Sequence, residues 1–213
     1  MSSSSTNVSI SDSLEEERFL PAVTLIFVTV FASTYLAQLL IAGNLSRNAG
    51  IEAVRTVKNV VGTSSTILTW MFHSNHSHFL GNLLVFILSG WWVENRVDQK
   101  RFGLMIVFVL GIGANTVATM LLGTLGVGIS GITAGLVTLV TLGHLEAVFD
   151  DDVRLIRSAM VFALSSVYIL RTVGMLGPLP PGTAVDIHIL GVAIGVMWYA
   201  NEKFQYEFTY AAK

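Results

Sequence analysis

The sequence contains no cysteine among its 213 residues and few charged residues, and both shortages restrict what the protein can be. Without cysteine there is no disulfide, no thiolate nucleophile and no cysteine-ligated metal. Charged residues make up 12% of the chain, which is about half the share of an ordinary soluble domain. No Asp, Glu, Lys or Arg occurs in residues 19–46, 59–93 or 102–145. These uncharged runs exclude a soluble enzyme, a nucleic-acid-binding protein and a disordered chain, but they suit membrane spans of about 20 apolar residues each.

Six membrane-spanning helices are predicted from the apolar segments and the breaks between them. The last uncharged run is too long for one helix, and it breaks at the glycine-rich segment 123–131, because glycine favours non-helical backbone. The charged stretch 43–70 has Val and Ile at helical spacing, which favours a re-entrant or interfacial first loop. The predicted spans are residues 20–42, 78–93, 102–122, 130–145, 155–174 and 184–199.

The predicted fold class is therefore all-α, a polytopic membrane protein built as a six-helix bundle over residues 20–200. We expect a disordered Ser-rich N-terminal tail over residues 1–19 and a C-terminal tail over residues 201–213. With cytoplasmic termini, the inside segments would carry eight basic residues and the outside segments four. Because cytoplasmic loops are enriched in Lys and Arg, this count predicts a multi-pass cell-membrane protein with both termini cytoplasmic.

Several polar residues fall near the predicted outer ends of the second and fourth spans, where an unpartnered polar group is costly. His78 and Asn82 are four residues apart, so they share a helix face. Two such donors can stabilise an oxyanion or bond to neighbouring helices. Ser130 lies between Gly128 and Gly131 at a predicted helix start. It suits either a nucleophile in a tight turn or a simple N-cap.

The last span carries a histidine one turn before a pair of glycines. Gly191 and Gly195 are four residues apart, a spacing that lets another helix approach closely. His188 can therefore reach a residue of a partner helix, either as a base for Ser130 or as a structural histidine. Asp186 is two residues away, about 200° around the helix, so we expect its carboxylate to point away from the imidazole.

The remaining histidines have simpler expected roles. His73 is five residues before His78, and we expect it to bond to loop backbone. His76 is expected to be an exposed loop residue, and His144 an interfacial residue at the inner end of the fourth span.

Three separated blocks resemble motifs of the rhomboid family of intramembrane serine proteases. The blocks are weak separately, but they come in the family's order and in the matching spans, over about residues 20–200. They are Phe72-His73-x4-His78-x3-Asn82, Gly128-Ile129-Ser130-Gly131 and His188-x2-Gly191-x3-Gly195.

The resemblance implies an intramembrane serine endopeptidase with a Ser130–His188 dyad. Ser130 would attack the scissile carbonyl and His188 would act as general base and then acid. His78, Asn82 and the Ser130 backbone N–H would hold the oxyanion. The other implied roles are support of the site by His73, Gly128 and Gly131, and helix packing by Gly191 and Gly195.

The resemblance also implies what the protein acts on. Its substrates would be single-pass or polytopic membrane proteins whose transmembrane segments enter from the lipid bilayer. The active site would open to the outer side, and no cofactor, metal or nucleic acid is implied.

Four positions depart from the family pattern. Ala134 stands where an aromatic residue often lies beneath the catalytic histidine, which indicates that this imidazole is held differently. Ile187 replaces an often small residue, Asp98 stands where a glycine is common, and the first loop lacks a Trp-Arg pair.

Three alternatives stay open at this point. The first is an inactive rhomboid-like module that binds membrane proteins without cutting them. The second is a metal- or haem-binding membrane protein that uses His73, His76, His78 and His188. The third is a small channel or transporter, although the inner halves of the spans hold few polar residues.

Overall fold

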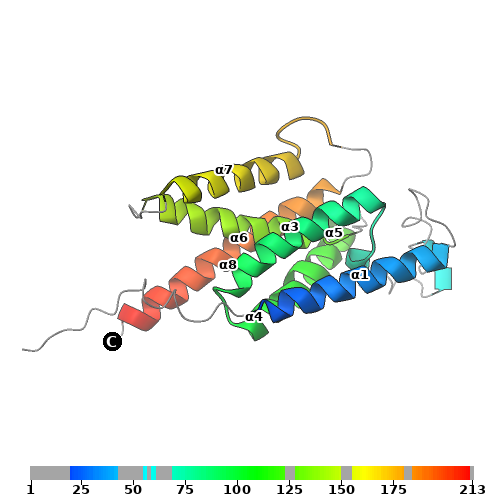
Figure 1. The fold of residues 1–213 in the computed structure, drawn as a ribbon, viewed down its shortest axis with the longest axis horizontal. Helices are drawn as coiled ribbons and strands as arrows, with labels where there is room; N and C mark the ends of the chain where they lie inside the picture. The colour runs from blue at the N-terminus through cyan, green and yellow to red at the C-terminus, as the bar shows by residue number, and fades with distance from the viewer. Residues whose placement is uncertain are drawn as a thin grey trace, which may run out of the picture.

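The computed structural model describes residues 20–42, 55–56, 59–60, 69–122, 128–149, 155–179 and 184–211. These residues contain helices and turns and no strand. A π-helical stretch, η3, lies between α4 and α5, and Figure 1 shows the arrangement. The elements are α1 (Ala22–Ala42), α3 (His76–Glu94), α4 (Gln99–Leu104), η3 (Met105–Gly113), α5 (Ala114–Leu122), α6 (Ser130–Phe149), α7 (Leu155–Thr172) and α8 (Val185–Ala211).

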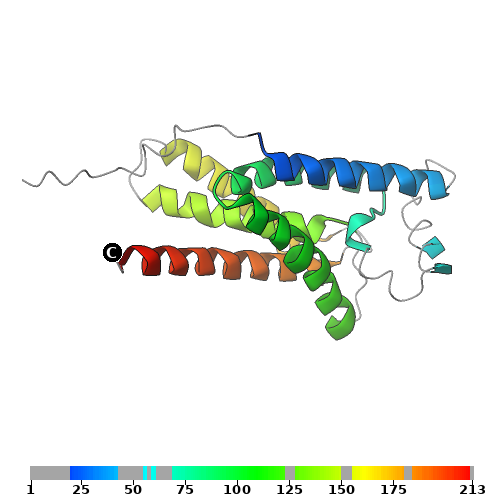
Figure 2. The ribbon, with the colours of Figure 1, turned by 90° about the horizontal axis from the view of Figure 1, so that it is seen from below.

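Helix α6 is the central element of the bundle. Every residue from 130 to 141 is buried, and α6 packs against α3, α7 and α8. Figure 1 shows α7 along one side of α6, and Figure 2 shows α8 and α1 on opposite sides of the molecule. Since α6 is enclosed by other helices, it needs no apolar lipid-facing surface and can carry polar residues.

Four glycines bring α6 and α8 into backbone contact. A methyl group added at Gly191 would collide with the carbonyl oxygen of Gly131, and one added at Gly195 would lie 2.6 Å from the carbonyl oxygen of Gly135. Small residues allow such close crossing of membrane helices. Gly191 and Gly195 thus lie in the contact between α6 and α8, with Gly131 and Gly135 opposite them.

A buried carboxylate joins α1 to α3. Glu94, the last residue of α3, accepts hydrogen bonds from the backbone N–H groups of Val23 and Thr24 at 2.9 and 2.8 Å. The hydroxyl of Thr24 donates to the same carboxylate at 2.7 Å. Because the first N–H groups of a helix lack partners within it, this carboxylate caps the positive end of α1.

Aromatic side chains fill the space between α1 and α3. Phe31 contacts the rings of Phe86 and Trp70 edge to face, with centroids 5.2 and 5.9 Å apart. Trp70 also presses on η3, because a methyl group at Gly111 would lie 3.0 Å from its ring. The π-helical stretch η3 is therefore the part of the chain that the large side chain of Trp70 packs against.

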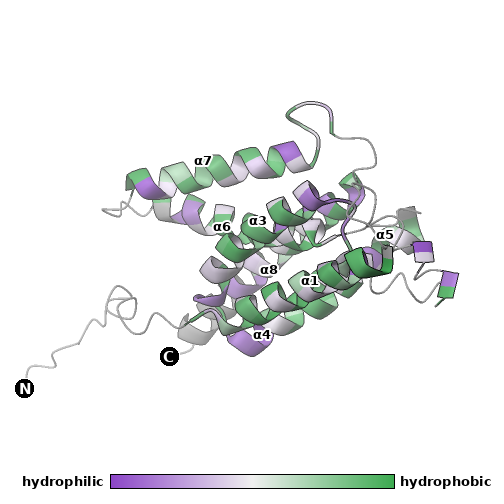
Figure 3. Cartoon of the chain, turned by 45° about the vertical axis from the view of Figure 1, so that its right-hand side comes forward, coloured by the Kyte–Doolittle hydropathy of each residue, from purple (hydrophilic) through white to green (hydrophobic). Residues whose placement is uncertain are grey.

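Three helical stretches are long and apolar enough to cross a membrane, among the described residues: 22–41, 99–121 and 155–172. Large apolar side chains are exposed on the outer helices, and Figure 3 shows that most of the ribbon of α1 and α3 is coloured as hydrophobic. The exposed side chains include Leu40, Leu84, Phe108, Leu164 and Met197. This surface suits contact with lipid rather than water.

Helices lie at the six segments predicted as spans, with shifted ends, and among the described residues three of these segments are long and apolar enough to cross a membrane. The largest difference is in α8, which continues to Ala211 although the predicted span ends at residue 199. The predicted N-terminal tail lies outside the described residues, as does most of the predicted interfacial helix, of which only residues 55–56 and 59–60 are seen, as helix.

We predict that Gly191→Ala lowers stability by about 1–3 kcal/mol, because its methyl group must push α8 away from α6. Thermal unfolding of the detergent-solubilised protein measures the effect. Gly81→Ala is the matched control, since nothing lies within 4 Å of a methyl group there. A Gly191→Ala variant as stable as the Gly81→Ala variant would contradict the close helix crossing.

Candidate functional site

A tight turn positions Ser130 at the first residue of α6. Gly128 has φ of +110°, a conformation that favours glycine. Its N–H donates to the carbonyl of Thr69 at 3.3 Å. A methyl group there would lie 3.2 Å from the His78 ring and 3.3 Å from the His73 ring. The turn that leads into Ser130 thus lies directly against two histidines. Ser130 itself is buried.

His73 is fully buried and is hydrogen-bonded to the backbone of this turn. The backbone N–H of Ile129 donates to His73 Nε2 at 3.4 Å. Burial, and then the nearby His78, lower the pKa of His73 to about 3. A neutral ring can accept a hydrogen bond at one nitrogen, as this contact requires.

The backbone of His73 is fixed by α1. The buried amide of Gln38 accepts from the His73 N–H at 3.0 Å and donates to the His73 carbonyl at 2.5 Å. Helix α1 therefore reaches the site through Gln38, and also through Tyr35, whose ring meets the His73 ring edge to face with centroids 6.2 Å apart. The sequence contained a signal for Gln38, because a polar glutamine is unusual in a long apolar run. The sequence analysis did not single it out.

A short polar chain orients His78. Asn75 caps α3 by accepting from the His78 backbone N–H at 2.9 Å. Its amide donates to Ser74 Oγ at 3.2 Å, and that hydroxyl lies 3.1 Å from His78 Nδ1. Ser74 accepts this bond, so its O–H is available to donate to Nδ1. With that bond direction, the ring proton of His78 is on Nε2.

Asn82 lies one turn further along α3. It is buried, and its Nδ2 has no hydrogen-bond partner among the described residues. A buried donor without a partner costs free energy, so its presence suggests a ligand that completes it.

His188 is held by the end of α7. Its ring is buried, and Nδ1 lies 2.9 Å from the backbone carbonyl of Thr172. A carbonyl only accepts, so Nδ1 carries the proton and Nε2 is a free base. Thr172 acts through its backbone, which explains why no side-chain pattern indicated it.

The start of α8 lies against the start of α6. A methyl group at Gly131 would lie 2.5 Å from Ile187 Cγ2, so the residues next to Ser130 and His188 touch. The ends of α3, α6 and α8 thus bring the predicted residues to one end of the bundle.

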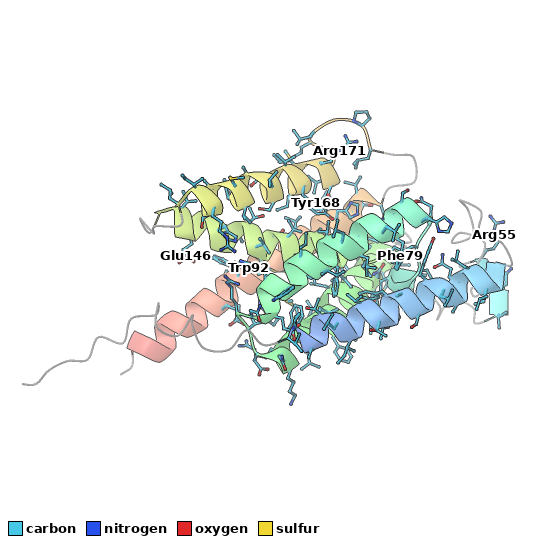
Figure 4. All side chains as sticks on the ribbon, viewed as in Figure 1. Arg55, Phe79, Trp92, Glu146, Tyr168 and Arg171 are labelled. Atoms are coloured by element: carbon cyan, nitrogen blue, oxygen red, sulfur yellow. The ribbon has the colours of Figure 1, made fainter. Side chains whose placement is uncertain are left out.

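Helix α7 is tied to α6 by hydroxyl groups. Thr133 donates to the carbonyl of Ser130 at 2.8 Å, and its Oγ lies 3.0 Å from the hydroxyl of Tyr168. Figure 4 shows Tyr168 on the side of α7 that faces α6. The contact between Thr133 and Tyr168 positions α7, whose last residue, Thr172, is bonded to His188. No sequence pattern indicated this contact.

One expectation from the sequence is wrong. His76 is half-buried rather than exposed, and its Nδ1 lies 2.5 Å from the hydroxyl of Tyr35. Tyr35 also stacks on Phe79 with ring centroids 4.1 Å apart. His76 therefore joins α3 to α1 through the hydroxyl of Tyr35, whose ring partly covers it.

Nothing in the described part of the chain gathers three His, Asp or Glu side chains in a way that could hold a metal ion. His188 and His78 use one ring nitrogen each for Thr172 and Ser74. The histidines are thus arranged as separate hydrogen-bonding groups.

A known protein family matches this part of the chain. The Rhomboid domain matches residues 62–201, which is more than half of the chain and includes every residue of the site named above except Gln38 and Tyr35 of α1. No curated protein and no solved structure matches the chain. The chain belongs to the rhomboid family, whose members are generally intramembrane serine proteases.

Proposed function

We propose that this protein is an intramembrane serine endopeptidase that cleaves transmembrane segments of membrane-protein substrates with a Ser130–His188 dyad. One observation carries the proposal. The Nδ1 of His188 is satisfied by the carbonyl of Thr172 at 2.9 Å, so Nε2 is left as the base, on a helix packed by glycines against the helix of Ser130.

In the first step, His188 Nε2 takes the proton of the Ser130 hydroxyl as Oγ attacks the scissile carbonyl. The imidazolium then gives that proton to the leaving amine, and the acyl group stays on Ser130. Water releases the acyl group in the second step, again with His188 as base. The Thr172 carbonyl serves both steps, because its hydrogen bond becomes stronger when the ring is charged.

The oxyanion would be held by donors from two helices. The Nε2–H of His78, oriented through Ser74, and the unpartnered Nδ2 of Asn82 come from α3. The backbone N–H of Ser130, at the start of α6, adds a third donor and the positive end of a helix. Donors that are in place before the reaction need no reorganisation in the transition state.

Gly128 and Gly131 would support this arrangement from either side of Ser130. His73 would hold the turn through Ile129, and Gly191 and Gly195 would set the distance between the dyad's helices. The proposal also includes six spans, cytoplasmic termini, a site open to the outer side and substrates entering from lipid.

Replacement of either dyad residue tests the reaction. We expect Ser130→Ala and His188→Ala each to reduce cleavage of a transmembrane substrate in liposomes by about 10⁴-fold or more, without unfolding the protein. Ser165→Ala is the matched control, because that hydroxyl bonds to carbonyls of its own helix. Full cleavage by Ser130→Ala would show that the proposed nucleophile is wrong.

Covalent labelling separates an active protease from an inactive relative. A fluorophosphonate should label Ser130 in the wild-type protein, and labelling should be lost in His188→Ala, because the hydroxyl needs a base. Mass spectrometry of the labelled peptide identifies the residue. Absence of labelling in folded wild-type protein would favour the inactive, substrate-binding alternative.

The oxyanion donors make a third prediction. Asn82→Ala should lower kcat by about 10²–10³-fold with little change in KM, because the lost bond matters most in the transition state. Asn201→Ala, an exposed amide on α8, is the control and should leave kcat unchanged. A purely structural role for Asn82 would instead lower the melting temperature and leave kcat per folded molecule intact.

A further inference from the structure

A second polar cluster lies at the end of the bundle opposite Ser130 and His188. The last turn of α3, the C-terminal half of α6, the start of α7 and the middle of α8 enclose a cleft of about 430 Å³. Trp92 and Glu146 mark this end in Figure 4, and Tyr168 and Arg171 lie toward the other end. Nothing in the proposed proteolysis uses this cleft.

Two arginines line the cleft. The guanidinium of Arg96 lies over the ring of Trp92, with Cζ 3.8 Å from the ring centroid, and donates to the Trp92 carbonyl at 2.9 Å. Its other N–H groups have no partner among the described residues. Arg157 reaches the same cleft from the first turn of α7. An Arg fork with unused donors is well suited to a phosphate group.

The guanidinium groups of Arg96 and Arg157 carry like charges and repel each other. Desolvation lowers the pKa of Arg96, and the charge of Arg157 lowers it further. Like charges held together are relieved by an anion placed between them.

The acidic residues of the cleft do not offset this preference. Glu202 forms an ion pair with Arg101 at 2.9 Å. Glu146 accepts a hydrogen bond from the hydroxyl of Tyr199. Two arginines and two carboxylates thus line the cleft, and both carboxylates already have donors of their own.

Neutral donors and an apolar wall complete the cleft. His144 Nδ1 lies 3.4 Å from the hydroxyl of Ser158, and the His144 ring packs on Trp92 with centroids 5.2 Å apart. The indole N–H of Trp198 is buried and without a partner in the described part of the chain. Val93 and Leu139 supply apolar surface. Such a cleft suits a ligand with a phosphate at one end and a short apolar part at the other.

We propose that this cleft binds a phosphate group, held by Arg96 and Arg157 between the rings of Trp92 and Trp198. The group belongs either to the headgroup of an anionic phospholipid or to free phosphate. Exposed apolar helix surface next to the cleft makes a lipid accessible to it, and basic pockets between membrane helices bind anionic headgroups.

Tryptophan fluorescence of the full chain in a neutral maltoside detergent tests the proposal, since Trp92 and Trp198 line the cleft. The probes are dihexanoyl phosphatidylglycerol, dihexanoyl phosphatidylcholine and sodium phosphate, with sodium chloride matched for ionic strength. We expect a saturable change with phosphatidylglycerol whose midpoint rises about 10-fold or more in Arg96→Gln and in Arg157→Gln. Lys100→Gln, an exposed cation on the neighbouring α4, should keep the wild-type midpoint.

The arms distinguish the two sources of phosphate. Saturation by phosphatidylglycerol alone identifies a lipid site, and equal saturation by sodium phosphate identifies a site for free phosphate; both support the proposal. A response that sodium chloride reproduces, or that both arginine variants retain, overturns it. If Arg96→Gln does not fold, Arg157→Gln decides alone, because Arg157 is exposed and its loss leaves no buried group unpaired. Failure here leaves the proteolytic proposal untouched, since that site lies at the other end.

Discussion

The close crossing of α6 and α8 is the contact on which the rest of the structure depends. Gly131 and Gly135 face Gly191 and Gly195 so closely that added methyl groups would meet backbone oxygens. Such contact between helices relies on backbone packing, because lipid gives no hydrophobic driving force for helix association. The same crossing sets the distance between the residue that begins α6 and the histidine of α8.

Around this crossing, the other helices supply orientation. Thr172 at the end of α7 fixes the His188 ring through a carbonyl, and Tyr168 fixes α7 through Thr133. In a family whose members often place an aromatic ring beneath this histidine, Ala134 leaves that support out. Here a hydrogen bond to the backbone carbonyl of Thr172 holds the imidazole, and it also determines which ring nitrogen carries the proton.

Much of the fold could be predicted from the sequence, because uncharged runs and glycine breaks are local features. The motif residues could be predicted for the same reason, since spacings of four place His78 and Asn82 on one helix face. The carboxylate of Glu94 on the start of α1, and Gln38 on the backbone of His73, could not, because each joins residues distant in sequence. Sequence spacing also misplaced His76, since the ring of Tyr35 that covers it comes from another helix.

The sequence by itself determined that this is an all-helical membrane protein of the rhomboid family with serine and histidine at helix ends. It could do so because apolar length, glycine spacing and short motifs are properties of contiguous residues. Only the tertiary structure decided the hydrogen bonds of each ring nitrogen, the unpartnered amide of Asn82 and the arginine-lined cleft at the far end. Those features depend on distances between helices, which the packing of side chains and backbone sets and no single segment contains.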